Sequence, residues 1–219
     1  MRITLIHALR HSPPPIEESF RRLWPEARLR HLLDDGLSAD LARDGEITPA
    51  MTQRFLDLAG YAVRSGADAI LFTCSAFGTC IEACAAAHPD IPVLKPNEAM
   101  IEEAVTQGGT IGLLATFAPT LASMPPEFPH QVKLRSCLAE GALAALDRGD
   151  VAGHDRMAVE ASRQLAGCTT IALAQFSLAR VAAAVAEATG RPVLTTPDCA
   201  VRKLRRIMLS EHDGAGHAA

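Results

Sequence analysis

Aromatic residues are scarce in this sequence of 219 residues, at 4%, and charged residues amount to only 21%. Hydrophobic residues make up 48%, and alanine, leucine and valine supply most of them. A chain of this length and composition can bury a sizeable core, which excludes an intrinsically disordered protein. Because these core residues are small, we expect helices to pack closely on sheets.

An excess of positive charge is also absent. The chain has 21 Lys and Arg against 25 Asp and Glu, a net charge of −4 at pH 7. This balance argues against a nucleic-acid-binding surface. We interpret the one dense basic stretch, residues 202–206, as a solvated helix face near a helix C-terminus. No nucleic-acid partner is therefore expected.

Long hydrophobic runs are missing as well. No stretch approaches the roughly 20 apolar residues of a membrane-spanning helix, and His7, Arg10 and His11 interrupt the N-terminal apolar run. We expect neither a membrane span nor a signal peptide, and we expect a cytoplasmic location. None of the six cysteines forms a Cys-x-x-Cys pair, so free thiols are expected.

Sequence signatures of nucleotide and zinc chemistry are absent too. The chain contains no Walker loop, no Gly-x-Gly-x-x-Gly, no His-Glu-x-x-His and no Gly-x-Ser-x-Gly. Cys74, Cys80 and Cys84 lie close in sequence, but their spacing is unusual for zinc and no histidine is placed to complete a site. We therefore expect no cofactor and no metal.

The strongest positive signal is an internal repeat. Residues 66–77 (GADAILFTCSAF) resemble residues 167–178 (GCTTIALAQFSL), at an offset of 101 residues (167 − 66). Three pairs of similar blocks in one order indicate a duplicated half-domain. The other two pairs are residues 2–12 with 110–120, and residues 91–100 with 191–201.

Short β-rich runs alternate with longer helical patterns along the chain. This alternation predicts βαβ units: an α/β fold of two pseudo-symmetric halves, each with a mostly parallel four-stranded sheet flanked by helices. The predicted strands are residues 3–6, 28–33, 69–73, 92–94, 110–115, 132–135, 169–174 and 192–195. The predicted helices are residues 16–24, 49–65, 77–87, 97–106, 139–147, 152–166, 176–188 and 198–209.

The repeat also predicts the domain organisation. We expect a first half at residues 1–96 and a second half at residues 97–196, with the C-terminal helix 197–209 packing back on the first half. Residues 210–219 are expected to be a frayed tail. In open α/β sheets, ligands bind beyond the carboxyl ends of the strands. We therefore expect an active-site cleft between the halves, lined by these strand ends.

Cys74 is the leading candidate for a reactive group. It stands at a predicted strand end, where Ser75 and Ala76 enter a helix. Unpaired backbone N–H groups and the helix dipole at such a position lower the pKa of a thiol. A buried structural cysteine is the alternative, and Cys199 is the second candidate thiol. The remaining cysteines are interpreted as core residues: Cys80, Cys84, Cys137 and Cys168.

Hydroxyl-bearing residues recur at equivalent strand ends of the two copies. Thr116 and Thr120 flank the loop after one predicted strand, and Ser12 matches Thr120 in the repeat. Hydroxyls and free N–H groups at helix starts can hold a carboxylate, whereas helix capping is the alternative for each residue alone. The candidate substrate-binding residues are Ser12, Ser75, Ala76, Thr116, Thr120, Phe176 and Ser177.

Three sets of short motifs carry a resemblance to a known family. They are Thr-Cys-Ser at 73–75 after Ala-Asp-Ala-Ile at 67–70, Gly-Leu-Leu-Ala-Thr at 112–116 with Thr120, and Pro-Val-Leu at 92–94 and 192–194. In this order, and over nearly the whole chain, they resemble the aspartate/glutamate racemase superfamily, which includes hydantoin racemase, maleate isomerase and arylmalonate decarboxylase. The resemblance implies two α/β halves, an active site between them and no cofactor.

In the racemases of this family, each half supplies one cysteine, and the two thiols act on opposite faces of the α-carbon. Cys74 matches the first of these cysteines, whereas Gln175 stands at the position of the second. Glutamine can hydrogen-bond a carboxylate or an enediolate, but it exchanges no proton near neutral pH. His7, at the first strand end, is the leading candidate for a second proton carrier, with a solvated or capping histidine as the alternative.

The resemblance therefore implies a cofactor-independent racemase- or isomerase-like enzyme that acts on a small carboxylic or amino acid through Cys74. Gln175 keeps two alternatives open. One is a one-thiol decarboxylase or lyase, and the other is a non-catalytic carboxylate-binding or regulatory relative. The expected partner is a small carboxylate, and assembly into a homo-oligomer stays open.

Overall fold

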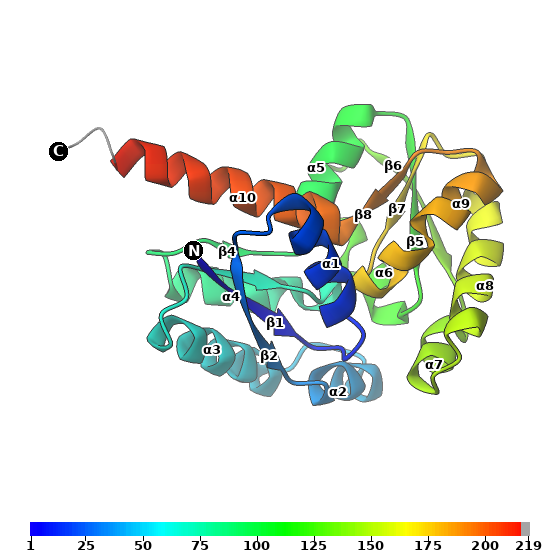
Figure 1. Ribbon diagram of the computed structural model, residues 1–219. Helices are drawn as coiled ribbons and strands as arrows, with labels where there is room; N and C mark the ends of the chain where they lie inside the picture. The colour runs from blue at the N-terminus through cyan, green and yellow to red at the C-terminus, as the bar shows by residue number, and fades with distance from the viewer. Residues whose placement is uncertain (216–219) are drawn as a thin grey trace. The chain divides into compact units, whose positions relative to one another are not determined.

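The computed structural model describes the backbone of residues 1–215 and the side chains of residues 1–210 (Figure 1). The chain divides into two compact units. Unit 1 comprises Met1–Pro96 together with the chain after Thr196, and unit 2 comprises Asn97–Thr196. The polypeptide therefore leaves unit 1 once and returns to it with its last helix.

Each unit contains one four-stranded sheet. The strands are β1 (Arg2–His7), β2 (Arg28–Leu33), β3 (Ala69–Phe72), β4 (Val93–Leu94), β5 (Thr110–Ala115), β6 (Lys133–Leu138), β7 (Thr170–Leu173) and β8 (Val193–Thr195). Their order is β2-β1-β3-β4 in unit 1 and β6-β5-β7-β8 in unit 2, and every pairing is parallel. The predicted α/β fold is confirmed, and the sheets are entirely rather than mostly parallel.

The two sheets repeat each other in register. Ile3 of β1 pairs with Ala69 of β3, and the matching residue Ile111 of β5 pairs with Thr170 of β7. The central strands β1, β3, β5 and β7 are almost completely buried, as expected for strands covered by helices on both faces. The internal repeat is thus a repeat of structure as well as of sequence.

Ten helices connect and cover the strands in the described part of the chain. They are α1 (Pro13–Leu23), α2 (Gly36–Asp44), α3 (Pro49–Arg64), α4 (Gly78–Ala87), α5 (Glu98–Gln107), α6 (Ala118–Ser123), α7 (Ala142–Asp147), α8 (Val151–Ser162), α9 (Ala182–Thr189) and α10 (Thr196–Ala215). Two short 3₁₀ segments, η1 (Ser75–Phe77) and η4 (Phe176–Val181), follow β3 and β7. The sequence analysis did not predict α2 and α6.

The last helix is longer than predicted. It spans Thr196–Ala215, whereas the prediction ended it at residue 209, because the glycines and histidines of the expected tail suggested fraying. Residues 210–215 continue the helix, and residues 216–219 of the expected tail lie outside the described part of the chain.

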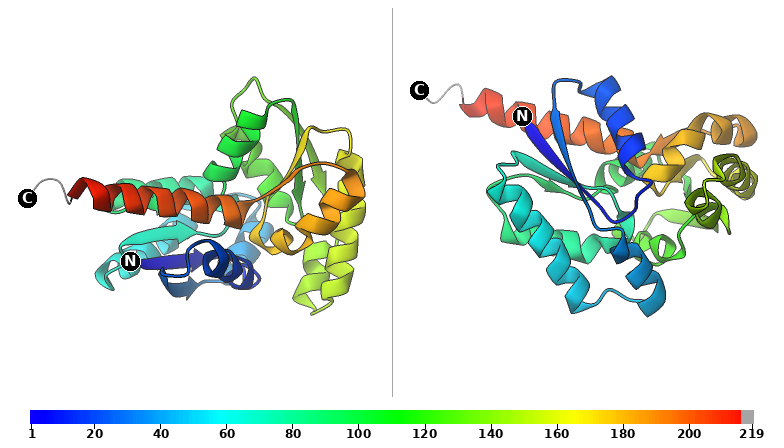
Figure 2. Two further views of the ribbon diagram at one scale, coloured as in Figure 1. Left: turned by 45° about the horizontal axis from the view of Figure 1, so that its top comes forward. Right: turned by 60° about the horizontal axis from the view of Figure 1, so that its bottom comes forward.

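Helices cover both faces of the unit 1 sheet. α1 and α10 lie on one face, and α3 and α4 pack together on the other (Figures 1 and 2). Asp198 joins α10 to α1, since its carboxylate accepts hydrogen bonds of 2.6 Å from both the Ser19 hydroxyl and the Arg22 guanidinium. Arg205 adds a bond of 3.1 Å to the carbonyl oxygen of Leu23, where α1 ends.

Two neighbouring glycines before β5 test how closely the backbone that enters β5 approaches the residues before β7. Both have positive φ angles, +71° for Gly108 and +75° for Gly109. A Cβ atom at Gly108 would meet open space, whereas a Cβ at Gly109 would overlap the Thr169 hydroxyl, which accepts a 3.1 Å hydrogen bond from Thr110 N.

We therefore predict that Gly109→Ala destabilises the protein more than Gly108→Ala. Both variants incur the strain of a positive φ, of about 1–3 kcal/mol, and at Gly108 this strain is that of a backbone region restricted to glycine, since its ψ is −174°. Only Gly109→Ala also displaces Thr169. Urea unfolding of the two variants measures the difference. Equal free energies of unfolding would contradict the close approach of Gly109 to Thr169.

Candidate functional site

The carboxyl ends of β1 and β3 carry the candidate residues of unit 1. Because these strands are neighbours in a parallel sheet, the residues that follow them meet at one edge, and Thr73 N donates a 3.0 Å hydrogen bond to the carbonyl oxygen of Ile6. The residues gathered here are nearly inaccessible to solvent: His7, Ser12, Cys74, Ser75 and Ala76. Ser12 donates to the carbonyl oxygen of Thr73 at 3.5 Å and makes no side-chain cap on α1.

Cys74 is a buried thiol between β3 and η1. Burial raises its pKa to about 11, while hydrogen bonds from Ala76 N–H and the Ser38 hydroxyl act in the opposite direction. The sequence-based expectation of a lowered pKa is therefore wrong for this structure. The following helix is only the three-residue η1, so loss of hydration outweighs the donors at its start. Cys74 is a neutral thiol at pH 7.

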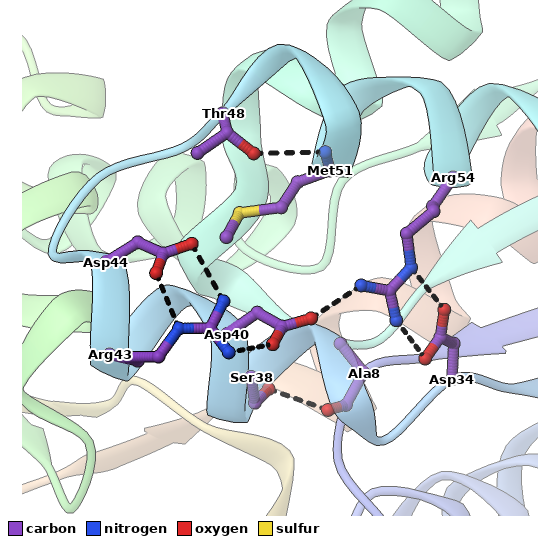
Figure 3. A network of polar contacts seen from close by, with 9 residues as sticks. All are labelled: Ala8, Asp34, Ser38, Asp40, Arg43, Asp44, Thr48, Met51 and Arg54. Carbon is purple, nitrogen blue, oxygen red and sulfur yellow. Dashed lines mark hydrogen bonds and ion pairs between the residues drawn. The ribbon is translucent and has the colours of Figure 1, made fainter.

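Ser38 is a neighbour of Cys74 that the sequence analysis missed. It lies on α2, is buried, and donates a 2.6 Å hydrogen bond to the carbonyl oxygen of Ala8 (Figure 3). Its one hydroxyl proton thus has two acceptors, the Ala8 oxygen and the Cys74 sulfur. Ser38 connects the end of β1 with the thiol that follows β3.

Charged side chains hold α2 in place around Ser38. Arg54 of α3 makes a bidentate pair with Asp34, at 2.5 and 2.8 Å, and a 2.7 Å bond with Asp40 (Figure 3). The hydrogen bond from Arg54 lowers the pKa of the Asp40 carboxyl. Thr48 caps α3 by accepting a bond of 3.3 Å from Met51 N. These contacts fix the helix that presents Ser38.

Ser38→Ala is predicted to raise the pKa of Cys74 further, because it removes a donor to the thiolate. A hydrogen bond to a charged group contributes about 1.5–3 kcal/mol, which corresponds to a pKa change of about one unit or more. The pH dependence of Cys74 alkylation, with the adduct located by mass spectrometry, measures this change. Ser19→Ala is the matched control, because Ser19 is a buried serine bonded to Asp198. An unchanged pH profile in Ser38→Ala would contradict the contact.

His7 is a buried neutral imidazole within a chain of polar groups. Its Nδ1 lies 2.7 Å from Thr73 Oγ1, and its Nε2 lies 3.0 Å from His31 Nδ1. His31 Nε2 lies 3.4 Å from the Glu17 carboxylate, which is half-exposed. Because Thr73 Oγ1 also lies 3.3 Å from the Ile6 carbonyl and can donate to it, His7 Nδ1–H is the donor to Thr73. Burial, followed by repulsion from His31, lowers the pKa of His7 to about 3.

This lowered pKa predicts a specific acid sensitivity. An unfolded histidine titrates near 6.5, so between about pH 6.5 and 3 the unfolded chain binds a proton that folded His7 does not. The free energy of unfolding should therefore fall with falling pH, by up to about 1.4 kcal/mol per unit from this residue. His7→Asn should flatten the fall, and His130→Asn, at an exposed position, should not. Identical pH profiles for wild type and His7→Asn would refute the assignment.

Gln175 organises the candidate residues of unit 2, at the ends of β5 and β7. Its side-chain oxygen accepts three hydrogen bonds: from Thr116 N at 2.5 Å, from Phe117 N at 3.1 Å and from Thr116 Oγ1 at 3.1 Å. The other predicted residues nearby in the fold, Thr120, Phe176 and Ser177, are buried. Thr116 is therefore engaged by the chain itself.

Several buried polar atoms at this edge of the unit 2 sheet have no protein partner. They follow β7 and end β8, which are neighbouring strands. These atoms are Gln175 Nε2, Ser177 Oγ, Thr195 Oγ1 and Thr196 Oγ1. A buried polar group without a partner costs about 1–3 kcal/mol, so this edge is suited to a polar ligand.

Cys80 has a similar local setting, since burial raises its pKa and the Thr52 hydroxyl, 3.5 Å from its sulfur, acts in the opposite direction, but it lies within α4 and not at a strand end. All six are buried free thiols, and burial also raises the pKa of Cys84, to about 12. Cys199, the second candidate, lies on α10, where Arg202 Nη2 donates to its sulfur at 3.2 Å. Within the described residues, no group of three or more His, Cys, Asp or Glu side chains is arranged to hold a metal.

Sequence reasoning missed Ser38, Thr73, His31 and Phe117. Phe117 contributes only its backbone N–H, and Ser38 lies on a helix that was not predicted. Thr73 and His31 lie at or near strand ends, so the edge position was the one available signal.

Between residues 1 and 215, no helix has the length and apolar character required to cross a bilayer.

Two α/β units, each with a parallel sheet of equivalent strand order and polar residues at its strand ends, match the fold that the motifs suggested. The Asp/Glu/hydantoin racemase family model matches residues 16–204. The chain therefore belongs to this family and is a racemase-type protein. Among curated proteins, none matches the chain.

Solved structures show the same fold at low sequence identity. Glutamate racemase from Francisella tularensis subsp. tularensis SCHU S4, in complex with D-glutamate, has a TM-score of 0.74 and 14% identity, covering 96% of this chain and 82% of that one. Allantoin racemase from Klebsiella pneumoniae has a TM-score of 0.68 and 13% identity, covering 96% and 89%. A glycine-to-cysteine mutant of arylmalonate decarboxylase, in a sulfate-associated form, has a TM-score of 0.62 and 19% identity, covering 100% and 95%.

Proposed function

We propose that this protein is a cofactor-independent racemase- or isomerase-like enzyme that acts on a small carboxylic or amino acid through Cys74. The observation that carries the proposal is the buried Cys74 thiol at the end of β3, with Ala76 N–H and Ser38 as donors to its sulfur. Family membership supports the reaction class. The free, buried thiols suit a reducing compartment, so the proposed location is the cytoplasm.

The protonation state of Cys74 determines its role in this proposal. With a pKa of about 11, Cys74 carries its proton at neutral pH. It therefore donates that proton to the α-carbon of an enediolate, whose electron pair forms the new C–H bond, and the sulfur becomes a thiolate. The donors from Ala76 and Ser38 stabilise this thiolate. In the reverse direction the thiolate removes the α-proton.

Racemisation also requires a proton carrier on the opposite face of the α-carbon. Gln175 has no side-chain proton to exchange near neutral pH. His7 is the candidate in this proposal, because its ring connects through His31 to the half-exposed Glu17 carboxylate. The candidate substrate-binding groups are Ser12, Ser75, Ala76, Thr120, Phe176 and Ser177, whereas Thr116, the remaining predicted residue, is bonded to Gln175. The cleft shared by the two halves stays a prediction.

A one-thiol lyase is the second candidate function. The raised pKa of Cys74 and the glutamine at position 175 both favour proton delivery to one face only. In a decarboxylation, the C–C electron pair of an activated acid stays on the α-carbon as CO₂ leaves, and Cys74 then supplies the proton. A carboxylate-binding relative without turnover is the remaining alternative.

Incubation in deuterated water distinguishes these functions. The substrates are single enantiomers of amino and hydroxy acids, and a disubstituted malonate. We expect solvent deuterium at the α-carbon, detected by NMR, and a loss of about 100-fold or more in Cys74→Ala. Cys199→Ser is the control thiol and should retain the exchange. Conversion to the mirror isomer supports the racemase, and His7→Asn then tests the second carrier.

Release of CO₂ from the malonate with one product enantiomer supports the lyase instead. Full activity in Cys74→Ala would eliminate Cys74 from either mechanism. If a carboxylate raises the Tm but neither deuterium exchange nor CO₂ release is detected, the result supports the third alternative, a carboxylate-binding relative without turnover.

A further inference from the structure

The environment of the Gln175 oxygen is that of a bound anion. Two consecutive backbone N–H groups, of Thr116 and Phe117, and the Thr116 hydroxyl all donate to this one atom, at 2.5, 3.1 and 3.1 Å. Consecutive N–H groups that converge on one point form an anion-binding nest. A neutral amide oxygen occupies here a position with the donors that suit a carboxylate oxygen. We refer to these three donors as the Thr116 nest.

We propose that Gln175 is a specificity-determining residue that fills the Thr116 nest and excludes an anionic ligand group from it. This inference rests on the proposed function in one respect, that the ligand is a small carboxylate. With the nest filled, the buried polar atoms without a partner that follow β7 and end β8 are all neutral. The inferred substrate class is therefore a monocarboxylate with an uncharged hydrogen-bonding substituent, and dicarboxylates are excluded.

The orphaned polar atoms support this substrate class. Gln175 Nε2 is buried and has no acceptor, although its own oxygen is fully engaged. Ser177 Oγ is likewise buried without a partner, and so are Thr195 Oγ1 and Thr196 Oγ1 at the end of the neighbouring strand β8. All four groups are neutral. An uncharged hydroxyl or carbonyl of the ligand can bond with them, whereas no charged group among the four offsets the desolvation of a second carboxylate.

Side-chain length explains why Gln175 can fill the nest. The equivalent residue in unit 1 is Cys74, whose sulfur is bonded directly to Cβ, whereas the glutamine oxygen lies two carbons further from Cβ. Shortening position 175 should therefore empty the nest without removing any of its three donors, which belong to Thr116 and Phe117.

The test compares wild type with Gln175→Ala by amide NMR of the ¹⁵N-labelled full chain. Sulfate, succinate and 4-hydroxybutyrate are the probes, and the Thr116 and Phe117 amide signals are the readout. In wild type, these signals should not respond to sulfate or succinate. In Gln175→Ala, both signals should shift, with an affinity for either dianion at least tenfold tighter than in wild type.

Two controls keep the result interpretable. Gln175→Glu retains an oxygen in the nest and adds negative charge, so it should reject sulfate and succinate as wild type does. If Gln175→Ala does not fold, Gln175→Asn, whose side chain is shorter than that of glutamine by one carbon, is used in place of the alanine variant. Tm shifts should follow the same order, with wild type favouring 4-hydroxybutyrate over succinate and the shortened variant reversing this preference.

The proposal would be overturned by either of two results. One is a shift of the Thr116 and Phe117 amide signals on addition of succinate that is as large in wild type as in Gln175→Ala. That result would mean that a ligand displaces the Gln175 oxygen from the nest. The other is no response in a folded, shortened variant. The same titrations in a Cys74→Ala background need no turnover, so a failure of the catalytic proposal leaves this test valid.

Discussion

Main-chain hydrogen bonds between the two central strands of each sheet determine where the candidate residues lie. Thr73 N donates to Ile6 O in unit 1, and Ala174 N donates to Leu114 O in unit 2, at 3.0 and 2.9 Å. Since the strands are parallel and in equivalent register, the residue after each of these donors meets the end of the neighbouring strand. The ladder therefore fixes the sites, and the side chains determine their chemistry.

Substitution at one equivalent position has given the two units different properties. Cys74 is short, so its sulfur stays buried near Ala76 N–H and Ser38, where loss of hydration controls its pKa. Gln175 is long enough to reach Thr116 and Phe117 and to accept their hydrogen bonds. The duplicated fold thus carries a neutral thiol in one unit and a filled anion nest in the other.

Apolar runs and periodicity were sufficient to predict all eight strands. The central strands β1, β3, β5 and β7 are buried and hydrophobic on both faces, whereas the edge strands β2 and β6 are largely exposed or half-buried. They were insufficient for α2, which starts at Gly36 without a side-chain cap and is held by ion pairs from Arg54. Ser38 was missed for that reason. The pKa of Cys74 was predicted in the wrong direction because the sequence shows the following helix but neither its brevity nor the depth of burial. Likewise, position 175 could be identified as the divergent one, but its bonds to the backbone of Thr116 and Phe117 depend on the tertiary fold.

The residues at the strand ends of unit 1 and those at the strand ends of unit 2 differ in their electrostatic properties. A thiol that is protonated at rest avoids placing a charge in a buried environment, and an approaching carboxylate disfavours the thiolate further. In the proposed function, proton donation is consequently the favoured direction for Cys74, with Ala76 N–H and Ser38 as the donors to the resulting thiolate. The corresponding donors of unit 2 are already bonded to Gln175 and add nothing to a developing negative charge. In the proposed function, the chemistry therefore depends on unit 1, whereas unit 2 is proposed to discriminate between ligands through the unbonded amide of Gln175 and the hydroxyl of Ser177.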